Sequence, residues 1–139
     1  MECPVHKLVA DVTVLSGGRV LLLKYRDSSK YDHQRGWFLP DDYLAFEEHP
    51  DVAARRILQE QVGFAPESVR LTHVESFGNG AWHLVFHYTT EASESPAITP
   101  GENVAAAEWF DLNGLPAPSE VAHEGWALDV LQHVLASRR

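Results

Sequence analysis

The segment from Gly36 to Phe64, GWFLPDDYLAFEEHPDVAARRILQEQVGF, constrains the fold of this chain more than any other stretch. A polar loop at residues 41–48, crowded with carboxylates, follows a short apolar run and precedes a segment of helical character. Pro50 suits the first position of a helix, where its missing N–H costs nothing, and Gly63 suits the residue just past the end. The sequence therefore predicts a helix over residues 50–62 that an acidic loop leads into.

Within this segment, several residues stand at the spacing of a known motif: Glu48, Arg56, Leu58, Glu60, Gly63 and Phe64. The pattern resembles the Nudix box, G-x5-E-x7-R-E-U-x-E-E-x-G-U, in which U is a bulky apolar residue, and Leu39–Pro40 precedes it as often in that family. Asp42 replaces the first glycine of the box, Ile57 the glutamate after the arginine, and Gln61 the last glutamate. The resemblance implies an α/β fold, namely a Nudix-type α/β/α sandwich with a mixed central sheet, in a single domain over residues 1–139.

The helix surface at positions 57, 60 and 61 is the metal site that the resemblance implies, because this spacing places three side chains on one face. Three carboxylates there would hold Mg²⁺ or Mn²⁺, which take oxygen ligands and share their shell with substrate phosphates. In this chain only position 60 remains ionisable on that face. The metal-ligand candidates are Glu60, Gln61, Glu48, Asp42 and Glu102, and the catalytic candidates are Glu60, Glu48, Arg56 and Glu102.

Residues around that surface could order the site or compensate for its losses. Arg56 is expected to pair with Glu48 and to order the loop rather than to do chemistry. Asp41 and Asp42 stand where the family usually has two glycines, and the backbone there often approaches the metal. Glu102 is placed like the extra acidic residue that many family members bring from a later loop. Whether these acids replace the lost ligands is left open by the sequence.

Two functions follow from the resemblance. The first is a divalent-metal-dependent hydrolase of a nucleoside diphosphate linked to another moiety, with a degraded metal site and weak activity. The second is a catalytically inactive Nudix-fold domain that binds a nucleotide or has a regulatory role. The loss of carboxylates at Ile57 and Gln61 favours the second function, and the retention of Glu48, Arg56 and Glu60 favours the first.

The composition restricts the partners of the chain. A formal net charge of −9 argues against a nucleic-acid polymer, because phosphate backbones bind clustered Lys and Arg. Cys3 is the only cysteine, which excludes an internal disulfide and suits a reducing compartment. No apolar run approaches the length of a membrane span, and the N-terminus lacks a signal-peptide core. We therefore expect a cytoplasmic protein with a small-molecule, nucleotide-type ligand and no membrane contact, with a homodimer, common among relatives, left open.

The rest of the chain predicts strands and one further helix around the acidic segment. Two aliphatic runs at residues 8–15 and 19–25 are joined by Ser16-Gly17-Gly18, a hairpin signal because glycine reaches positive φ without strain. The other expected elements are strands at residues 37–39, 69–77, 81–90 and 105–112, loops at 27–34 and 91–101, and a helix at 120–137.

Candidates for substrate binding outside the box are Arg26, Arg35, His83 and His87. The two arginines lie near the expected polar loop at 27–34, where they could meet a substrate phosphate. On the strand expected at 81–90, alternation places the histidines on one face and the aromatic residues on the other. We interpret the histidine face as a solvent-exposed sheet face that could line a substrate cleft, and the aromatic face as core.

Overall fold

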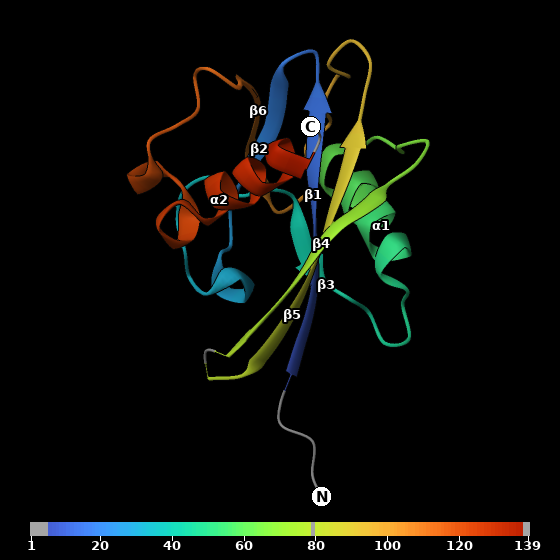
Figure 1. Ribbon diagram of the computed structural model, residues 1–139, viewed down its shortest axis with the longest axis vertical. Coiled ribbons are helices and arrows are strands. Elements are labelled where there is room, and N and C mark those ends of the chain that lie inside the picture. Colours follow the sequence, from blue (N-terminus) through green and yellow to red (C-terminus); the bar gives the residue numbers. More distant parts are fainter. Residues whose placement is uncertain (1–5, 79, 138–139) are drawn as a thin grey trace, which may run out of the picture.

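The computed structural model of the protein describes residues 6–78 and 80–137, so Cys3 lies outside the described residues. A sheet is flanked by helices (Figure 1). The strands are β1 (His6–Ser16), β2 (Arg19–Tyr25), β3 (Asp41–Tyr43), β4 (Arg70–Gly78), β5 (Trp82–Glu91) and β6 (Val104–Asp111). The helices are α1 (Pro50–Val62) and α2 (Ala122–Ser137), and short 3₁₀ helices form η1 (Ser29–Tyr31) and η2 (Pro118–Glu120).

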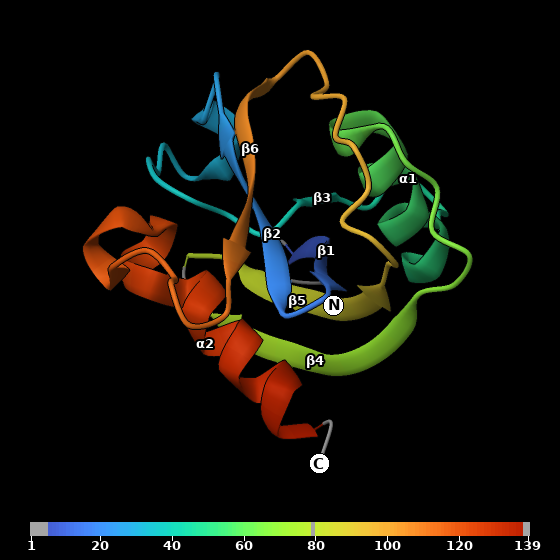
Figure 2. The ribbon, with the colours of Figure 1, turned by 90° about the horizontal axis from the view of Figure 1, so that it is seen from above.

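The strands form one mixed sheet in the order β4-β5-β1-β2-β6, with β3 paired to β1 beside this path. β1 and β5 run parallel, and the other pairings are antiparallel. Helix α1 covers one face of the sheet and α2 the opposite face (Figure 2). The α/β/α sandwich with a mixed central sheet is therefore confirmed, as are the strands expected near β4, β5 and β6.

The hairpin of β1 and β2 is also confirmed, but its strands separate soon after the turn, where only two residue pairs are in register. The chain after Gly36 enters this gap: Phe38 exchanges backbone hydrogen bonds with Leu23 at 2.7 and 2.8 Å, and β3 pairs with β1. The strand expected at residues 37–39 is therefore reduced to isolated bridges, and the loop expected at 41–48 begins with a strand. Both differences arise because β1 and β2 diverge: β2 offers backbone hydrogen bonds to Phe38, and β1 pairs with the residues of β3.

Helix α1 has the ends that the sequence predicts. Pro50 lies in its first turn, and Gly63 adopts a φ of 75° and donates its N–H to the Leu58 carbonyl at 3.0 Å. A side chain at Gly63 would be strained by this φ, and its Cβ would lie 2.8 Å from Thr99. Gly63 therefore ends the helix at Val62, within the last residues of the Nudix box.

The last helix differs from the continuous helix expected over residues 120–137. Three consecutive residues, His123–Gly125, have positive φ values of 54°, 58° and 99° before the regular helix begins. This left-handed turn lets Gly125 lie against Pro118, where an added Cβ would approach the Pro118 Cβ to 3.2 Å. The turn and Trp126 consequently lie beside the sheet, where they border a cavity described below.

Hydrophobic clusters fill both interfaces between helix and sheet. The cluster under α1 includes Val12, Val14, Leu21, Leu23, Ala54, Leu58, Val62 and Tyr88, and the cluster under α2 includes Leu15, Val20, Leu22, Trp37, Leu131 and Val134. The side chains of alternate positions on β1 and β2 thus serve opposite layers. In the part of the chain that the structure describes, no helix is long and apolar enough to cross a membrane.

Candidate functional site

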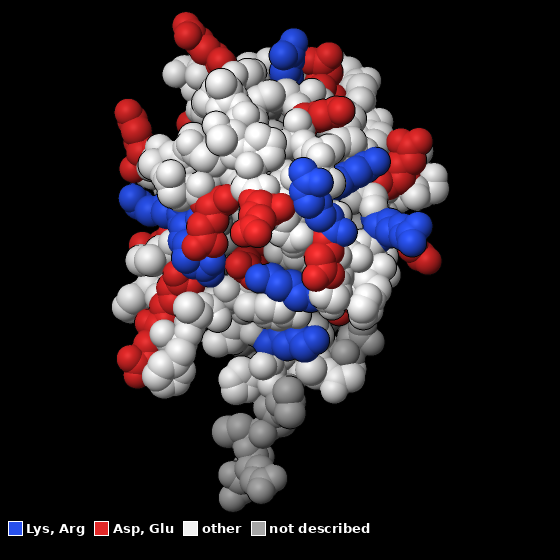
Figure 3. Space-filling model, turned by 180° about the vertical axis from the view of Figure 1, so that it is seen from behind, with Lys and Arg blue, Asp and Glu red and all other residues white. Residues whose placement is uncertain are grey.

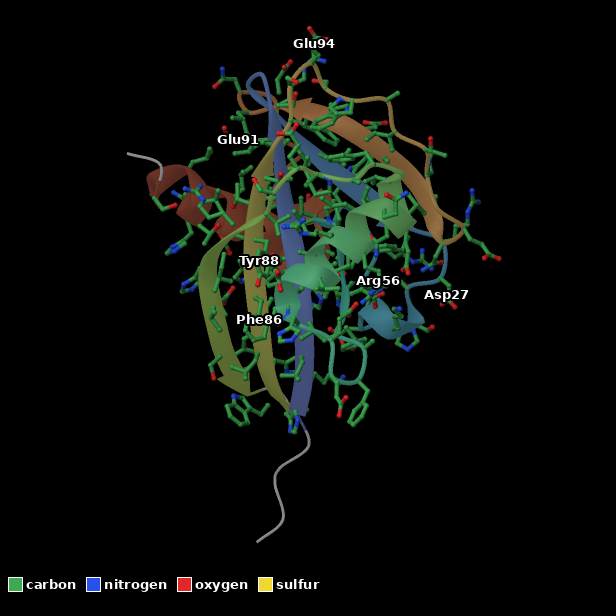
Figure 4. The ribbon with its side chains drawn as sticks, turned by 90° about the vertical axis from the view of Figure 1, so that its right-hand side faces the viewer. Asp27, Arg56, Phe86, Tyr88, Glu91 and Glu94 are labelled. Atoms are coloured by element: carbon green, nitrogen blue, oxygen red, sulfur yellow. The ribbon has the colours of Figure 1, made fainter. Side chains whose placement is uncertain are left out.

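The loop before α1 is tied to the helix by Arg56, which Figure 4 shows on α1. The guanidinium donates to both carboxylate oxygens of Glu48, at 2.8 and 3.0 Å, and to the Tyr43 carbonyl at 2.9 Å. These hydrogen bonds hold the pKa of Glu48 below its usual range. The expected pair of Arg56 and Glu48 is present, and its two-pronged geometry fixes the loop against the helix.

Arg56 also neutralises the other acids of this region. Its Nη1 atom lies 3.2 Å from a carboxylate oxygen of Asp42 and 3.2 Å from one of Glu60. Lys30 lies 2.7 Å from the other oxygen of Asp42. The side chain of Glu60 is 59% exposed, so it faces solvent apart from this contact. Three of the expected metal ligands, Asp42, Glu48 and Glu60, are therefore partners of one guanidinium.

The two helix positions that have lost their acid lie inside the protein. Ile57 is fully buried and packs with Ala10 of β1 between α1 and the sheet. Gln61 is 9% exposed and is hydrogen-bonded at both ends of its amide: its Nε2 donates to the Asp41 carbonyl at 2.8 Å, and its Oε1 accepts from the Tyr25 hydroxyl at 2.8 Å. The three positions of α1 that carry acids in the Nudix box therefore have different surroundings. Ile57 lies in the core, Gln61 lies among buried polar groups, and Glu60 lies at the solvent-exposed surface.

Two tyrosines complete this polar cluster around the Asp41 backbone. The rings of Tyr25 and Tyr31 stack with centroids 3.9 Å apart and planes 5° apart. Tyr31 donates its hydroxyl to the Asp41 carbonyl at 3.2 Å, and the Asp41 N–H donates to the Tyr25 hydroxyl at 3.0 Å. Burial and the charge of Asp41 raise the pKa of both hydroxyls, so both stay protonated donors. We call Tyr25, Tyr31, Gln61 and the Asp41 backbone the tyrosine cluster.

The acids around α1 meet at the guanidinium of Arg56 and do not form a metal site of their own. Among the residues that the structure describes, no three His, Cys, Asp or Glu side chains are grouped so that they could hold a metal ion. Glu102, the remaining expected ligand, is exposed. Its neighbour Gly101 donates its N–H to the Gln61 carbonyl at 3.0 Å, so the loop of Glu102 approaches α1 through backbone and not through a carboxylate.

A cavity of ≈ 240 Å³ lies beside the tyrosine cluster, on the face of the sheet that α2 covers. Its lining is rich in aromatic side chains, and we call it the aromatic cavity: Val9, Lys30, Tyr31, Asp32, Phe38, Asp41, Asp42, Tyr43, Phe77, His83, Val85, His123 and Trp126. Lys30 is the single Lys or Arg of this lining. Apolar walls with a few polar groups are the usual composition of sites for small molecules.

The Asp41 side chain belongs to this wall, although it is only 7% exposed. Its Oδ1 atom is buried and has no hydrogen-bond partner among the described residues. Burial, and then the charges of Asp11 and Asp42, raise the pKa of this carboxyl well above its ordinary value. In the same lining, His123 lies 3.4 Å from Asp32 and connects the start of α2 to the segment after η1.

The expected substrate-binding residues are only partly brought together. His83 lines the aromatic cavity, where its ring stacks on Phe77 with centroids 4.9 Å apart. Arg26 and Arg35 are exposed and lie outside the lining. Acidic and basic side chains are interspersed on the face of the molecule shown in Figure 3, so the Lys and Arg side chains of that face do not form a separate basic patch.

His87 corrects the interpretation of the histidine face of β5 as solvent-exposed. The side chain is 1% exposed, with Nδ1 at 2.7 and 2.9 Å from the two oxygens of Asp11 and Nε2 at 2.5 Å from Glu75. Burial disfavours the imidazolium, but the hydrogen bond and charge of Asp11, followed by those of Glu75, raise the pKa of His87. The interpretation was wrong because the alternation within β5 does not reveal that α2 packs over this face. The opposite face was expected to be core, and this is confirmed for Phe86 and Tyr88, which pack toward α1 (Figure 4), but Trp82 on the same face is 45% exposed.

His87 borders a second cavity of ≈ 230 Å³ between β4, β5 and α2. Its lining is His73, Glu75, His87, Trp126, Asp129, Val130, His133 and Val134, so Trp126 borders both cavities. Sequence reasoning missed Asp11, Glu75, Trp126 and the two tyrosines of the cluster. One usable signal was Asp11, a lone acid within the aliphatic run of β1.

The fold and this geometry define an α/β/α sandwich in which a Nudix-like helix and its preceding loop border a cavity of small-molecule size. The NUDIX domain family matches residues 5–130, and the chain belongs to this family. A search of curated protein sequences gave no match.

Solved structures with the same fold include three informative cases. A MutT NUDIX hydrolase from Burkholderia pseudomallei is 24% identical, with a TM-score of 0.77 over 93% of this chain and 98% of that one. The NUDIX domain of Shewanella oneidensis NrtR, complexed with ADP ribose, is 15% identical, with a TM-score of 0.77 over 100% and 91%. A bifunctional NMN adenylyltransferase/ADP ribose pyrophosphatase from Francisella tularensis, complexed with AMP and a Mn ion, is 13% identical, with a TM-score of 0.70 over 96% and 43%. At these identities the likeness establishes the fold alone.

Proposed function

We propose that this Nudix-family domain binds a nucleotide-type small molecule in the aromatic cavity without metal-dependent hydrolysis. The observation that carries this proposal is the tyrosine cluster, in which Gln61 and Tyr31 both donate to the Asp41 carbonyl. The backbone at this position often approaches the metal in Nudix relatives. A carbonyl oxygen has two lone pairs, and here two protein donors occupy them, so none is free for a cation.

The remaining side chains near α1 do not fit a divalent cation either. Ile57 offers no oxygen and lies in the core. Asp42, Glu48 and Glu60 share the guanidinium of Arg56. Mg²⁺ and Mn²⁺ need several oxygen ligands, and a cation placed among these carboxylates would have to displace a fixed positive charge that repels it. No catalytic step through a metal follows from this arrangement.

The aromatic cavity supports a nucleotide-type ligand. The rings of Tyr31, Tyr43 and Trp126 in its lining offer flat apolar surface suited to a planar base. Among proteins of the same fold, the Shewanella domain is complexed with ADP ribose and the Francisella protein with AMP. Because Lys30 is the single Lys or Arg of the lining and the chain carries a net charge of −9, a ligand with few phosphates is favoured over a polyphosphate.

A metal-dependent hydrolase of a nucleoside diphosphate linked to another moiety is the second candidate. Glu48, Arg56 and Glu60 stand at their positions in the Nudix box, and this retention favours it. Glu60 is also the acid of this group with the greatest exposure, so it is the one most accessible to an incoming cation.

Two assays separate the two candidate functions. Calorimetric titration measures the binding of ADP-ribose and of AMP, each with and without Mg²⁺ or Mn²⁺, and chromatography of the same mixtures detects any product. The proposal predicts saturable binding that metal does not strengthen, and no product. Metal-dependent product formation that Glu60→Gln abolishes would establish the hydrolase instead. Glu67→Gln, at an exposed position after α1, is the matched control and should behave as the wild type in every assay.

A further inference from the structure

The geometry points to Asp41 as the specificity-determining residue of the aromatic cavity: its carboxyl accepts a hydrogen bond from an N–H group on a planar ring of the ligand. This inference rests on the proposed binding function and deepens it. The class of ligand that it assigns is a nucleoside derivative whose base carries an exocyclic amine.

The register of β3 places the Asp41 side chain on the cavity face of the sheet. In the pairing of β3 with β1, Tyr43 lies opposite Val9 and Asp41 opposite Asp11. Side chains of directly opposed residues project from the same face of a sheet. Val9 and Tyr43 both line the aromatic cavity, and Asp41, two residues from Tyr43 on the same short strand, shares their face and the same lining.

The carboxyl of Asp41 is the unused part of an otherwise fully bonded residue. The Asp41 N–H donates to Tyr25, and its carbonyl accepts from Tyr31 and Gln61. Oδ1, by contrast, is buried without a partner among the described residues. An unpaired buried polar atom lowers the stability of the fold, and native structures contain few of them. A ligand group that supplies the missing hydrogen bond removes this cost on binding.

The nearest cation is not free to supply that partner. Lys30 lines the same cavity, but its ammonium lies 2.7 Å from Asp42. The two tyrosine hydroxyls of the cluster are also engaged elsewhere, because Tyr31 donates to the Asp41 backbone carbonyl and Tyr25 donates to Gln61 Oε1. The Asp41 carboxyl is therefore available to accept a hydrogen bond from a ligand in the aromatic cavity. The terminal torsion of an aspartate is broad, so either oxygen can turn toward a ligand without movement of the backbone.

An N–H donor on a flat ring is the ligand group that fits this cavity, because it can donate a hydrogen bond to the Asp41 carboxyl while the ring packs against the aromatic side chains of the lining. A carboxyl oxygen accepts a hydrogen bond in either protonation state, so the inference does not depend on the charge of Asp41. Tyr31, Phe38 and Trp126 supply aromatic surface around it. A site built to hydrogen-bond a ligand N–H rejects the analogue that lacks the group, because the polar atom of the site is then left unpaired.

Two matched ligand pairs test the inference on the full chain: AMP against purine riboside 5′-monophosphate, and GMP against inosine 5′-monophosphate. Within each pair the second compound lacks only the exocyclic amine. Affinities are measured by calorimetry and by quenching of tryptophan fluorescence, since Trp126 borders the cavity. We expect the amine-bearing member of at least one pair to bind the wild type about tenfold more tightly, as one hydrogen bond to a carboxyl implies.

Variants assign the preference to one side chain. Asp41→Leu should bind both members of the preferred pair equally, whereas Asp41→Asn, which keeps an oxygen acceptor, should retain most of the preference. Asp41→Ala replaces Asp41→Leu in the comparison if the leucine variant does not fold. Asp111→Asn, at an exposed position of β6, is the control and should keep the wild-type preference.

The outcomes separate this inference from the proposed function. Binding of both pairs without any preference, or a preference that survives in Asp41→Leu, overturns the role of Asp41 and leaves the binding function in place. Product formation from ADP-ribose with Mg²⁺ overturns the absence of hydrolysis and leaves the base preference in place. Failure of all four nucleotides to bind overturns both.

Discussion

Gln61 donates its side-chain amide to the backbone carbonyl of Asp41 at 2.8 Å, and this contact joins the end of α1 to the start of β3. A glutamate, the residue of the Nudix box at this position, has no N–H to donate and would place a negative oxygen against the carbonyl oxygen. The side chain is 9% exposed, so water cannot readily relieve such a repulsion. The surroundings of position 61 therefore favour glutamine over glutamate, because only the amide can donate a hydrogen bond to the Asp41 carbonyl.

Gln61→Glu is predicted to lower the free energy of unfolding by about 2–4 kcal/mol, because a buried donor is replaced by a buried carboxylate oxygen that faces the Asp41 carbonyl. Urea denaturation at neutral pH measures the change. Gln59→Glu, at an exposed position of the same helix, carries the same substitution and should shift the stability by no more than about 0.5 kcal/mol. Addition of Mg²⁺ should not restore the stability of Gln61→Glu. A recovery seen with Mg²⁺ and not with added KCl would show that the position can still ligate a cation.

Arg56→Lys is predicted to destabilise the fold by about 1–3 kcal/mol, although it preserves the charge. A lysine cannot reproduce the two parallel bonds to Glu48 together with the bond to the Tyr43 carbonyl, because these need the planar fork of a guanidinium. Thermal and urea unfolding provide the measurement. Arg55→Lys is the neighbouring exposed control. Equal stabilities of the two variants would mean that the loop before α1 is held by something other than this network.

Features with local causes could be predicted from the sequence. The signals for both ends of α1 lie in the helix itself or at the adjoining residue, namely Pro50 and Gly63, and the hairpin turn needs only its glycines. The pairing of Arg56 with Glu48 followed from the spacing of the box. Strand β3 was missed because its partners come from the separation of β1 and β2, which is a property of the whole sheet.

The environment of the helix face could be predicted only in part. The spacing correctly places Ile57 and Gln61 one turn apart on the same side of α1. It cannot reveal that Tyr25 and Tyr31, from β2 and η1, extend their hydroxyls to the same carbonyl as Gln61. Burial of His87 was missed for a similar reason, since its cover is supplied by a helix much later in the chain. In each case the decisive neighbour is distant in sequence.

Asp41→Asn is predicted to flatten the dependence of stability on pH. Burial raises the pKa of Asp41, so the folded chain keeps this proton to higher pH than the unfolded chain does. The free energy of unfolding therefore falls as the pH rises above about 3.9, the value for an unfolded aspartate. The asparagine variant lacks this contribution, and urea midpoints at a series of pH values should fall less steeply. Asp111→Asn should retain the wild-type slope, and the same slope in Asp41→Asn would contradict the assignment.

The buried arrangement of Asp11, His87 and Glu75 sets the sign of a further pH effect. A neutral imidazole has one N–H, whereas His87 faces a carboxylate at each ring nitrogen, so a second proton on the ring gives both carboxylates a donor and is favoured in the folded chain. Burial raises the pKa of Asp11, although the hydrogen bond and the charge of His87 lower it. Both shifts make the folded chain bind protons more tightly than the unfolded chain.

Other titratable groups around His87 contribute to any measured profile. From β4, the ring of His73 stacks on His87 with centroids 5.8 Å apart. From α2, Asp129 and His133 line the same cavity, and the ring centroids of His133 and His73 are 4.4 Å apart. The contribution of His87 is therefore measured as the difference in the free energy of unfolding between the wild type and a His87 variant at each pH.

His87→Gln is predicted to cost about 1–3 kcal/mol at pH 6 and less as the pH rises. The contribution of His87 is fully present below its unfolded pKa of about 6.5 and is lost as the pH passes through its raised folded value, because the folded state then releases the extra proton. The stability curves of the two proteins should consequently converge between neutral and alkaline pH in urea titrations. His49→Gln, at an exposed position before α1, should run parallel to the wild type throughout. Curves for His87→Gln that stay parallel to the wild type would show that His87 acts there by packing and hydrogen bonding without holding the extra proton.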